Sequence, residues 1–300
     1  MLHDNEVRVD AETASHLIRD QFPTYVGDDI QPLYEGTDNA VFQIGQRATA
    51  RFPLRKIDPQ VCADGLRREA SALDELSSCC PVPTPKPVGI GKPDYGYPMP
   101  WAVQSWVEGT TATPQVLCTS EVFASDTANL ISTLRQADTK GRPFVGSGRG
   151  GRLGDHEEWM TTCLENSEHF LDVPPLRRLW TLFRGLEAPS TLTMCHKDLI
   201  PANLLVEGNR LVGVLDGGTF GPADPALDLV AAWHLFDFAG REVLRTQLGC
   251  DEAEWWRGAG WAFEQAMGLV WYYNKTHSGM AALGRSTLKR IVSAPEFSTE

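Results

Sequence analysis

The order of two patterns along the sequence limits the possible folds most strongly. Short apolar runs within residues 41–52, joined at Gly45-Gln46, predict a β-hairpin, and a further strand is expected at 101–107. From residue 120 onward, the pattern becomes largely helical. A chain whose strands gather in its first third and whose remainder is largely helical favours an α+β fold.

The same order predicts two lobes of unequal size. At 300 residues, the chain exceeds what one hydrophobic core usually serves. We place the boundary where the strand at 101–107 ends, after a segment rich in proline and glycine. This gives a small N-terminal β-sheet lobe over residues 1–107 and a larger, mainly helical C-terminal lobe over residues 108–300. Helices are expected in the first lobe at 10–22 and 59–76.

The balance of charges argues against nucleic acid as a partner. Thirty-nine acidic and 27 basic residues give a net charge of −12, whereas binding to a phosphate backbone requires a basic face. No run approaches the roughly 18 apolar residues of a membrane span, and the N-terminus lacks a signal-peptide pattern. We therefore expect a cytoplasmic protein, monomeric or homodimeric, without membrane contact and with reduced cysteines.

A second predicted hairpin brings polar side chains together. Apolar runs on both sides of Glu207-Gly208-Asn209 predict this hairpin, and antiparallel pairing would return Leu215 beside Leu204. Asn203 and Asp216 then emerge next to each other at the open end. An amide oxygen beside a carboxylate suits Mg²⁺, which takes few protein ligands and completes its shell with water and phosphate.

Asp198 lies five positions before Asn203, close enough to face the same point through a tight loop. This is where a general base for a hydroxyl nucleophile would stand. Taken singly, each of these residues is as well explained as a capping or turn residue, because Asp and Asn favour loops. All three at these spacings, with the hairpin between them, favour a catalytic site.

At this point the chain resembles the aminoglycoside phosphotransferase family of small-molecule kinases, which have a protein-kinase-like two-lobe fold. The family's H-x-D-x-x-x-x-N loop matches His196, Asp198 and Asn203, and its D-x-G position matches Asp216 and Gly218. The resemblance implies that Asp198 is the catalytic base. It also implies that Asn203 and Asp216 hold Mg²⁺ against the phosphates of ATP or GTP.

The N-terminal segment resembles the same family. The segment from Gly36 to Phe42, which includes Asn39, is similar to its phosphate-covering loop, and Arg51 occupies the place of its phosphate-binding basic residue. Glu69, on the following helix, would pair with Arg51 and orient it. Without the rest of the pattern, Glu69 would be interpreted as a solvated helix charge.

The segment from Gln104 to Val107, which includes Trp106, is similar to the family's interlobe hinge, where backbone groups read the nucleobase edge. The sequence also departs from the family near the chemistry. Lys197 replaces a usual glycine, Gly217 replaces a usual large residue, and Ala223 stands where glycine is common. None of these changes removes a catalytic group.

The resemblance implies a phosphotransferase that moves the γ-phosphoryl group of ATP or GTP to a hydroxyl of a small molecule, with an aminoglycoside or related antibiotic first among the acceptors. Alternatives are a metabolic kinase for choline, homoserine or a sugar, a nucleotide-binding pseudokinase, and a metal-dependent hydrolase. The sequence leaves the acceptor open. His156 and His234 are interpreted as structural. Several acidic residues could form a cation pocket or lie solvated on helix faces: Glu157, Glu158, Glu165, Glu168 and Glu264.

Overall fold

The chain forms two compact units. The computed structural model describes residues 6–36, 38–146, 148–274 and 276–297. The first unit comprises the chain up to Ser78, then Pro83–Glu108 and the short return segment Gly217–Thr219. The second unit comprises Cys79–Val82, Gly109–Asp216 and the chain from Phe220 onward.

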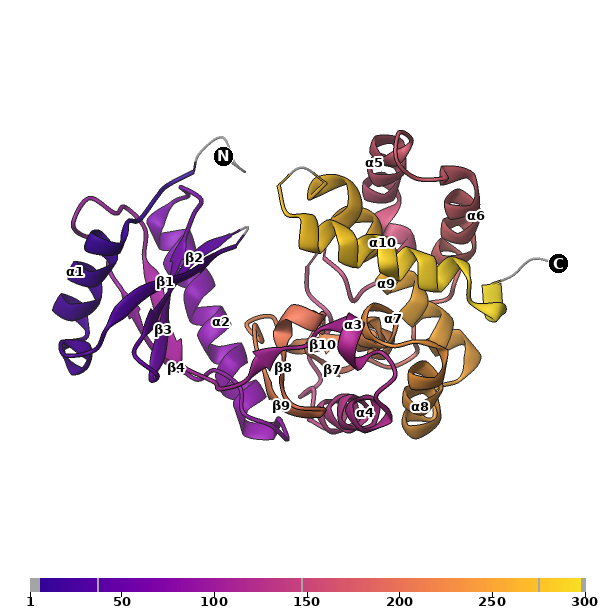
Figure 1. Cartoon of the computed structure of the whole chain (residues 1–300), viewed down its shortest axis with the longest axis horizontal. Coiled ribbons are helices and arrows are strands. Elements are labelled where there is room, and N and C mark those ends of the chain that lie inside the picture. The colour runs from indigo at the N-terminus through magenta and orange to yellow at the C-terminus, as the bar shows by residue number, and fades with distance from the viewer. Residues whose placement is uncertain (1–5, 37, 147, 275, 298–300) are drawn as a thin grey trace. The chain divides into compact units, whose positions relative to one another are not determined.

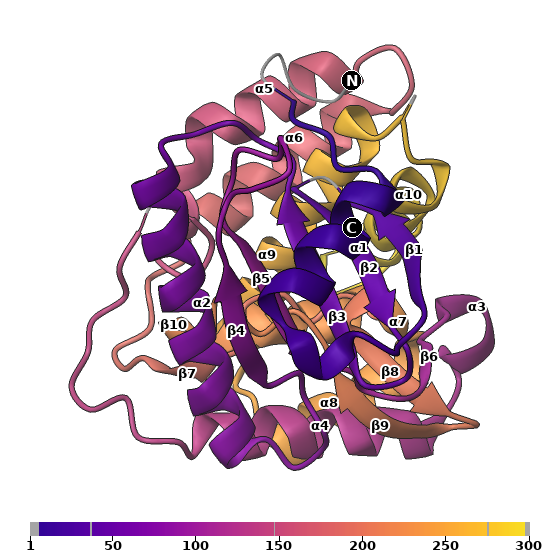
Figure 2. The same ribbon diagram turned by 90° about the vertical axis from the view of Figure 1, so that its left-hand side faces the viewer.

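The first unit is built on a five-stranded antiparallel sheet with strand order β1-β2-β3-β5-β4 (Figure 1). Its strands are β1 (Ile30–Glu35), β2 (Asn39–Ile44), β3 (Ala48–Pro53), β4 (Pro87–Gly91) and β5 (Trp101–Ser105). Helix α1 (Ala11–Gln21) lies on one side of this sheet, and helix α2 (Pro59–Cys79) lies on the other. Seen from the side of α1, the strands run behind that helix (Figure 2).

Local sequence explains the elements that the patterns predicted. The Asp10 side chain accepts a hydrogen bond from the Thr13 N–H and caps α1. The β2–β3 hairpin turns at Gly45, whose φ of 53° is a conformation that glycine adopts readily. Beneath α1, Phe52 stacks on Trp101 with ring centroids 4.7 Å apart, at the centre of an apolar core.

The second unit is mainly helical. Its helices are α3 (Pro114–Leu117), α4 (Glu121–Arg135), α5 (Glu157–Ser167), α6 (Val173–Arg184), α7 (Val230–Leu235), α8 (Phe238–Leu248), α9 (Glu252–Tyr272) and α10 (Ser278–Val292). Two small antiparallel sheets complete it, β6-β8-β9 and β7-β10. Their strands are β6 (Thr110–Thr111), β7 (Thr193–Cys195), β8 (Leu204–Glu207), β9 (Arg210–Val214) and β10 (Gly221–Ala223).

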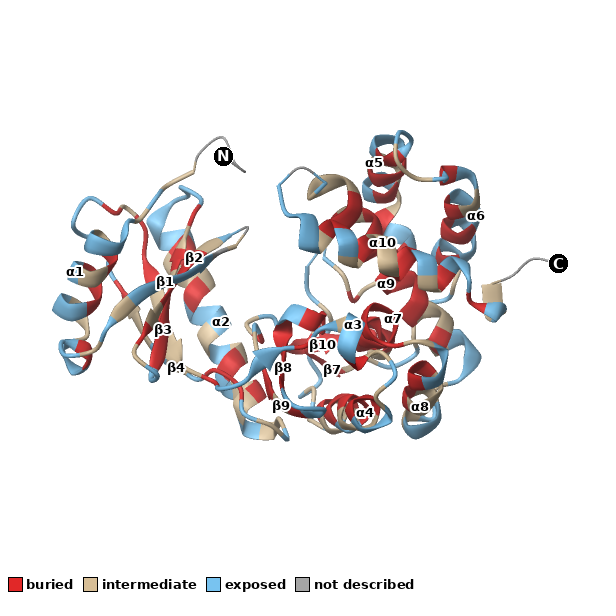
Figure 3. Cartoon of the chain, in the orientation of Figure 1, coloured by how far each residue is buried: buried red, intermediate tan, exposed pale blue. Residues whose placement is uncertain are grey.

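Helix α9 forms the core of this unit. Thirteen of its 21 residues are buried, including Trp255 and Trp261, so it is apolar nearly all round. The burial colouring shows this continuous buried stretch in α9, whereas α5 and α6 each bury only one side (Figure 3). Among the described residues, no helix is both long enough and apolar enough to cross a membrane.

The predicted fold class is confirmed: a small antiparallel-sheet lobe is joined to a larger helical lobe. The structure also contains strands that the patterns did not predict. β4 carries proline and glycine, which weaken a strand pattern, and β1 lies at the sheet edge with mostly exposed side chains. Helix α2 extends three residues beyond its expected end at residue 76, and β5 ends at Ser105.

Candidate active site

A carboxylate from farther along the chain holds the loop that follows β7. The oxygens of Asp228 accept the backbone N–H groups of His196 and Lys197, each at 2.8 Å. Asp228 is fully buried, and burial raises the pKa of its carboxyl, against the opposing influence of His196 and the two N–H donors. Lys197 has a φ of 76°, so this loop turns through a left-handed residue.

Asp198 and Asn203 are brought together by this loop. The two Nδ2 hydrogens of Asn203 are donated to the carbonyl oxygen of Asp198 and to its Oδ2, both at 2.9 Å. Asn203 is buried, whereas the Asp198 side chain remains 28% exposed. With its amide hydrogens used, Asn203 has only its Oδ1 to offer to a further ligand.

The hairpin that follows differs from its prediction by one position. Val214, not Leu215, pairs with Leu204, because Glu207 pairs with Arg210 across a turn of only two residues. A bulge between Leu205 and Val206 adds one residue to β9, so that Val214 rather than Gly213 lies opposite Leu204. The Leu215 N–H instead donates to the Asn203 carbonyl at 2.8 Å. Leu215 thus pairs with Asn203, and Asp216 is the next residue. The backbones of Asn203 and Asp216 therefore lie close together, as expected.

Three further hydrogen bonds, made by His196 and Asp224, stabilise the second unit. His196 Nε2 lies 2.9 Å from the carbonyl oxygen of Leu215 and ties the loop to the hairpin. The buried carboxylate of Asp224 accepts the Trp261 indole N–H and the Arg257 Nε, each at 3.0 Å. His196 Nε2 and the Asp224 carboxylate are thus engaged in hydrogen bonds within the protein.

The hydrolase alternative requires a cluster of metal ligands. Across the described residues, no group of three or more His, Cys, Asp or Glu side chains could hold a metal ion. Asp224 and Asp228 instead stabilise the fold through hydrogen bonds. The geometry therefore argues against that alternative. A magnesium site differs, because it needs only one or two protein oxygens.

Asp198 has two neighbours that the sequence analysis missed. Gln265, on α9, donates from Nε2 to Asp198 Oδ1 at 2.9 Å. Arg149 approaches the same oxygen at 3.8 Å and reaches Glu264 Oε2 at 3.6 Å. No motif marks either residue, because both come from segments far from the catalytic loop in sequence.

The acidic residues considered for a cation pocket do not form one group. Glu157 accepts the Trp180 indole N–H at 2.7 Å, and Glu168 pairs with Arg177 on the surface. Glu264 alone is buried, with its Oε1 3.1 Å from His156 Nδ1. Glu158 and Glu165 are exposed, as solvated helix charges are.

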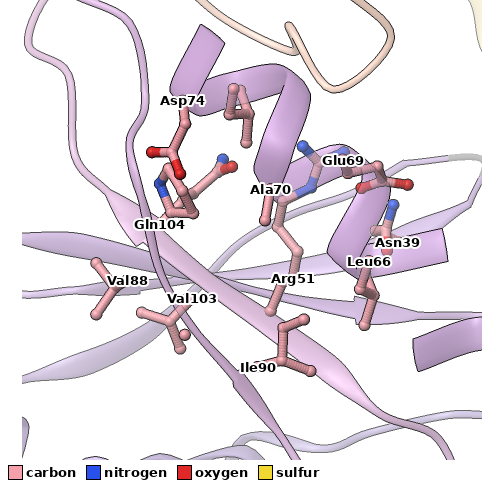
Figure 4. A pocket seen from close by; sticks show the side chains of 14 residues that line it. Asn39, Arg51, Leu66, Glu69, Ala70, Asp74, Val88, Ile90, Val103 and Gln104 are labelled. Carbon is pink, nitrogen blue, oxygen red and sulfur yellow. The ribbon is translucent and has the colours of Figure 1, made fainter. Parts of the chain in front are cut away.

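A pocket of about 330 Å³ opens in the first unit between α2 and the face of the sheet that carries Arg51. Four of the predicted nucleotide-binding residues line it: Asn39, Arg51, Glu69 and Gln104. The Arg51 side chain points toward Glu69 of α2, and Gln104 lies beside Asp74 of the same helix (Figure 4). The remaining wall is largely apolar, with Leu66, Ala70, Leu73, Val88, Ile90, Ala102 and Val103 among its residues.

Two other predicted nucleotide-binding residues do not line this pocket. The Gly36 N–H donates to the Asn39 carbonyl at 2.9 Å, and the Trp106 N–H donates to the Arg47 carbonyl at 3.0 Å. Both backbone donors are thus engaged within the unit. Thr37, between Gly36 and Asn39, lies outside the described residues.

The structure accounts for the unusual residues near the site. The Lys197 ammonium lies 5.7 Å from the centroid of the Phe144 ring, and burial lowers its pKa. A Cβ at Gly217 would overlap Leu76 of α2, so a large residue has no space there. A Cβ at Gly150 would lie 2.8 Å from that of Ala223, so the methyl group of Ala223 occupies space that Gly150 leaves open.

Comparison with solved structures shows the same fold over nearly the whole chain. The GDP complex of wild-type aminoglycoside 2'-phosphotransferase-IIIa is 19% identical, with a TM-score of 0.69, covering 95% of this chain and 99% of that one. The macrolide 2'-phosphotransferase MphH from Brachybacterium faecium is 18% identical, with a TM-score of 0.60, covering 95% and 99%. No curated protein matches the chain.

A family model gives the closer assignment. Residues 29–263 match the model of the phosphotransferase enzyme family, and this range includes parts of both units. The match confirms the resemblance carried by His196, Asp198 and Asn203, and with it the prediction of an enzyme. The chain belongs to the phosphotransferase enzyme family.

Proposed function

We propose that this enzyme transfers the γ-phosphoryl group of ATP or GTP to a hydroxyl of a small molecule, with an aminoglycoside or a related antibiotic as the first candidate acceptor. The observation that carries the proposal is the double hydrogen bond from Asn203 to Asp198. It orients a partly exposed carboxylate and leaves an amide oxygen beside the backbone of Asp216. A base next to two hard oxygen ligands suits phosphoryl transfer.

Asn203 Oδ1 and the Asp216 carboxylate fit Mg²⁺ as protein ligands, because both offer oxygen and no third protein ligand is needed. When bound, the ion would neutralise charge on the nucleotide phosphates. Asp198 would accept a hydrogen bond from the acceptor hydroxyl, orient its oxygen toward the γ-phosphorus, and take up its proton as the new P–O bond forms. The bond from the γ-phosphorus to the β–γ bridging oxygen would break in the same transfer and release ADP or GDP. The reaction then needs no covalent intermediate on the protein.

The nucleotide-binding part of the proposal assigns the lobe of residues 1–107 to the nucleotide and that of residues 108–300 to the acceptor. The lining of the first-unit pocket by Arg51, Glu69 and Gln104 supports it. Arg51 would contact phosphate, and Glu69 would orient Arg51. Gly36 and Asn39 would cover the phosphates, while the backbone near Gln104 and Trp106 would bind the base.

The choice of acceptor is supported by the structural neighbours and by charge. Two similar structures are complexes with kanamycin and with streptomycin, and those proteins are 18% and 16% identical to this chain. The net charge of −12 favours a cationic acceptor in the cell. A metabolic kinase for choline, homoserine or a sugar remains the second candidate, because fold does not select the acceptor.

The first test is calorimetric binding of ATP and GTP, each with and without Mg²⁺, to the wild type and to Asp216→Asn. We expect binding that strengthens with Mg²⁺ in the wild type and loses that gain in the variant. Asp172→Asn is the matched control, since Asp172 is exposed and its side chain makes no capping hydrogen bond. Absence of binding to either nucleotide would contradict the proposal.

Radiolabelled γ-phosphate transfer to kanamycin, streptomycin and a macrolide then tests the acceptor, with the nucleotide that binds more tightly. Transfer by the wild type and its loss in Asp198→Asn identify a kinase. A pseudokinase would be favoured if the wild type and Asp198→Asn bound the nucleotide equally well and neither transferred phosphate to an antibiotic, a metabolic alcohol or water.

A further inference from the structure

A continuous chain of hydrogen bonds leads from Asp198 into the core of the second unit. Gln265 Nε2 donates to Asp198 Oδ1 at 2.9 Å, and Gln265 Oε1 lies 2.9 Å from His234 Nε2. His234 Nδ1 in turn lies 2.8 Å from Thr287 Oγ1. The three residues come from α9, α7 and α10, so three helices meet in one polar path.

Every member of this path behind Asp198 is withdrawn from solvent. His234 and Thr287 are 0% exposed, and Gln265 is 6% exposed. Polar groups buried in an apolar unit retain such a chain only when each donor meets an acceptor. Only one placement of the hydrogens therefore satisfies every group of the path. It follows from the carboxylate of Asp198, which can only accept.

The Asp198 end determines the orientation of Gln265. A carboxylate only accepts, so the Gln265 amide must present its Nε2 to Asp198 and its Oε1 to the imidazole. Oε1 also only accepts, so His234 must carry its proton on Nε2. Nδ1 is then an acceptor, and the Thr287 hydroxyl donates to it. Reversing any one of these groups would place two acceptors or two donors against each other.

His234 is suited to this neutral link. Burial lowers the pKa of its imidazole to about 4, with Arg149 and Arg290 acting in the same direction and the Gln265 bond acting against it. The ring is therefore uncharged near neutral pH and holds a single proton. A protonated ring would donate from both nitrogens and break the bond from Thr287.

We propose that Gln265, His234 and Thr287 form a positioning relay that fixes the carboxylate plane of Asp198 for catalysis. Asn203 holds Oδ2 from the loop side, and Gln265 holds Oδ1 from α9. With each oxygen held by a separate amide, the carboxylate cannot rotate away from the acceptor hydroxyl. Arg149 approaches Oδ1 only at 3.8 Å and does not replace the Gln265 hydrogen bond.

The relay rests on the proposed function, in which Asp198 is the base. The test compares Gln265→Met, Thr287→Val and Thr287→Ser with the wild type. Methionine keeps the length of glutamine without its amide, valine keeps the shape of threonine without its hydroxyl, and serine restores that hydroxyl. Gln247→Met is the matched control, because Gln247 is exposed on α8 and its Nε2 bonds to Ser125.

Turnover is measured with Mg²⁺ and the preferred nucleotide, using whichever antibiotic accepts phosphate, or water as the acceptor if none does. We expect Gln265→Met to lower kcat about tenfold while KM for the nucleotide changes less than twofold, because positioning acts on the reacting atoms. Thr287→Val should lower kcat by a smaller factor, and Thr287→Ser should restore it. In an Asp198→Ala background, Gln265→Met should change the residual rate less than twofold.

Unchanged kcat in folded Gln265→Met would overturn the relay, as would equal losses in Thr287→Val and Thr287→Ser. A second readout does not depend on turnover. Long-range ¹H–¹⁵N correlations of the wild-type imidazoles at pH 7 should show His234 neutral and protonated on Nε2. A ring protonated on Nδ1 or on both nitrogens would overturn the relay even in a protein that transfers no phosphate. Failure of the proposed function is thereby separated from failure of the relay.

Discussion

Asp228 and Lys197 lie 31 positions apart, and the carboxylate of the first accepts the backbone N–H of the second at 2.8 Å. The same carboxylate accepts the N–H of His196. Asp228 therefore determines the path of the chain directly before Asp198, although its own side chain is fully buried. The orientation of the proposed base depends on a residue that never reaches the substrate.

The backbone of Lys197 leads to a first prediction. Its φ of 76° costs an ordinary residue about 1–2 kcal/mol, whereas glycine adopts this conformation freely. We expect Lys197→Gly to leave the free energy of unfolding unchanged or raise it by up to about 1 kcal/mol. Lys197→Val should lower it by more than about 1 kcal/mol, because a β-branched residue fits this region poorly. Urea unfolding of the two variants measures both changes. Equal free energies of unfolding would show that the backbone conformation at residue 197 does not favour glycine.

Asp228→Asn provides a second prediction. The amide keeps the shape of the carboxylate but turns an NH₂ group toward one of the two backbone donors. We expect a loss of about 1–3 kcal/mol in the free energy of unfolding, since a buried N–H is left unpaired. Turnover should fall more than tenfold, while nucleotide affinity in calorimetry should remain close to that of the wild type. An equal loss of binding and turnover would place Asp228 in a different role.

Sequence patterns predicted the parts of this protein that depend on neighbouring residues. The β2–β3 hairpin follows from Gly45 and alternating apolar residues, and α1 follows from its Asp10 cap. The proximity of Asp198 and Asn203 was predictable because the two residues lie only five positions apart in one loop. In each case, one short segment carries the whole signal.

Contacts between distant segments could not be predicted in this way. The second hairpin pairs Glu207 with Arg210 across a two-residue turn and contains a bulge at Leu205. Its apolar pattern marks neither feature, so the expected partner of Leu204 was one residue away from the observed one. Gln265 lies 67 positions from Asp198 on a helix that also carries Glu254, Arg257 and Glu264, so nothing local distinguishes it. The sequence suggested only a structural role for His234. Its partners Gln265 and Thr287 lie far away in sequence and become adjacent only after folding.

Gly217 and Leu76 allow a third prediction. A methyl group at Gly217 would overlap the Leu76 Cδ2, and Leu76 is fully buried. Gly217→Ala should therefore lower the free energy of unfolding by about 1–2 kcal/mol through overpacking. In a Leu76→Ala background, the same substitution should cost less than about 0.5 kcal/mol, because the space is then open. Equal costs in both backgrounds, measured by urea unfolding, would show that the two residues are not coupled.

The buried imidazole of His234 provides a fourth prediction, for stability in mild acid. Its pKa falls from 6.5 to about 4 on folding, so between these values the unfolded chain binds a proton that the folded chain does not. The free energy of unfolding therefore decreases as the pH falls from 6.5 toward 4, by about 3 kcal/mol in total from this residue. Between pH 6.5 and 5, where most carboxylates stay ionised, the loss should be about 2 kcal/mol.

His234→Gln removes this titration and leaves the other histidines as an internal reference. We expect the variant to be less stable than the wild type at pH 7, because the bonds to Gln265 and Thr287 are disturbed. Its stability should nevertheless decline less steeply between pH 6.5 and 5. Parallel declines of the two proteins would mean that His234 titrates normally in the folded state. The ring would then be partly protonated near neutral pH, and the protonated fraction would lack the acceptor nitrogen that the Thr287 hydroxyl requires.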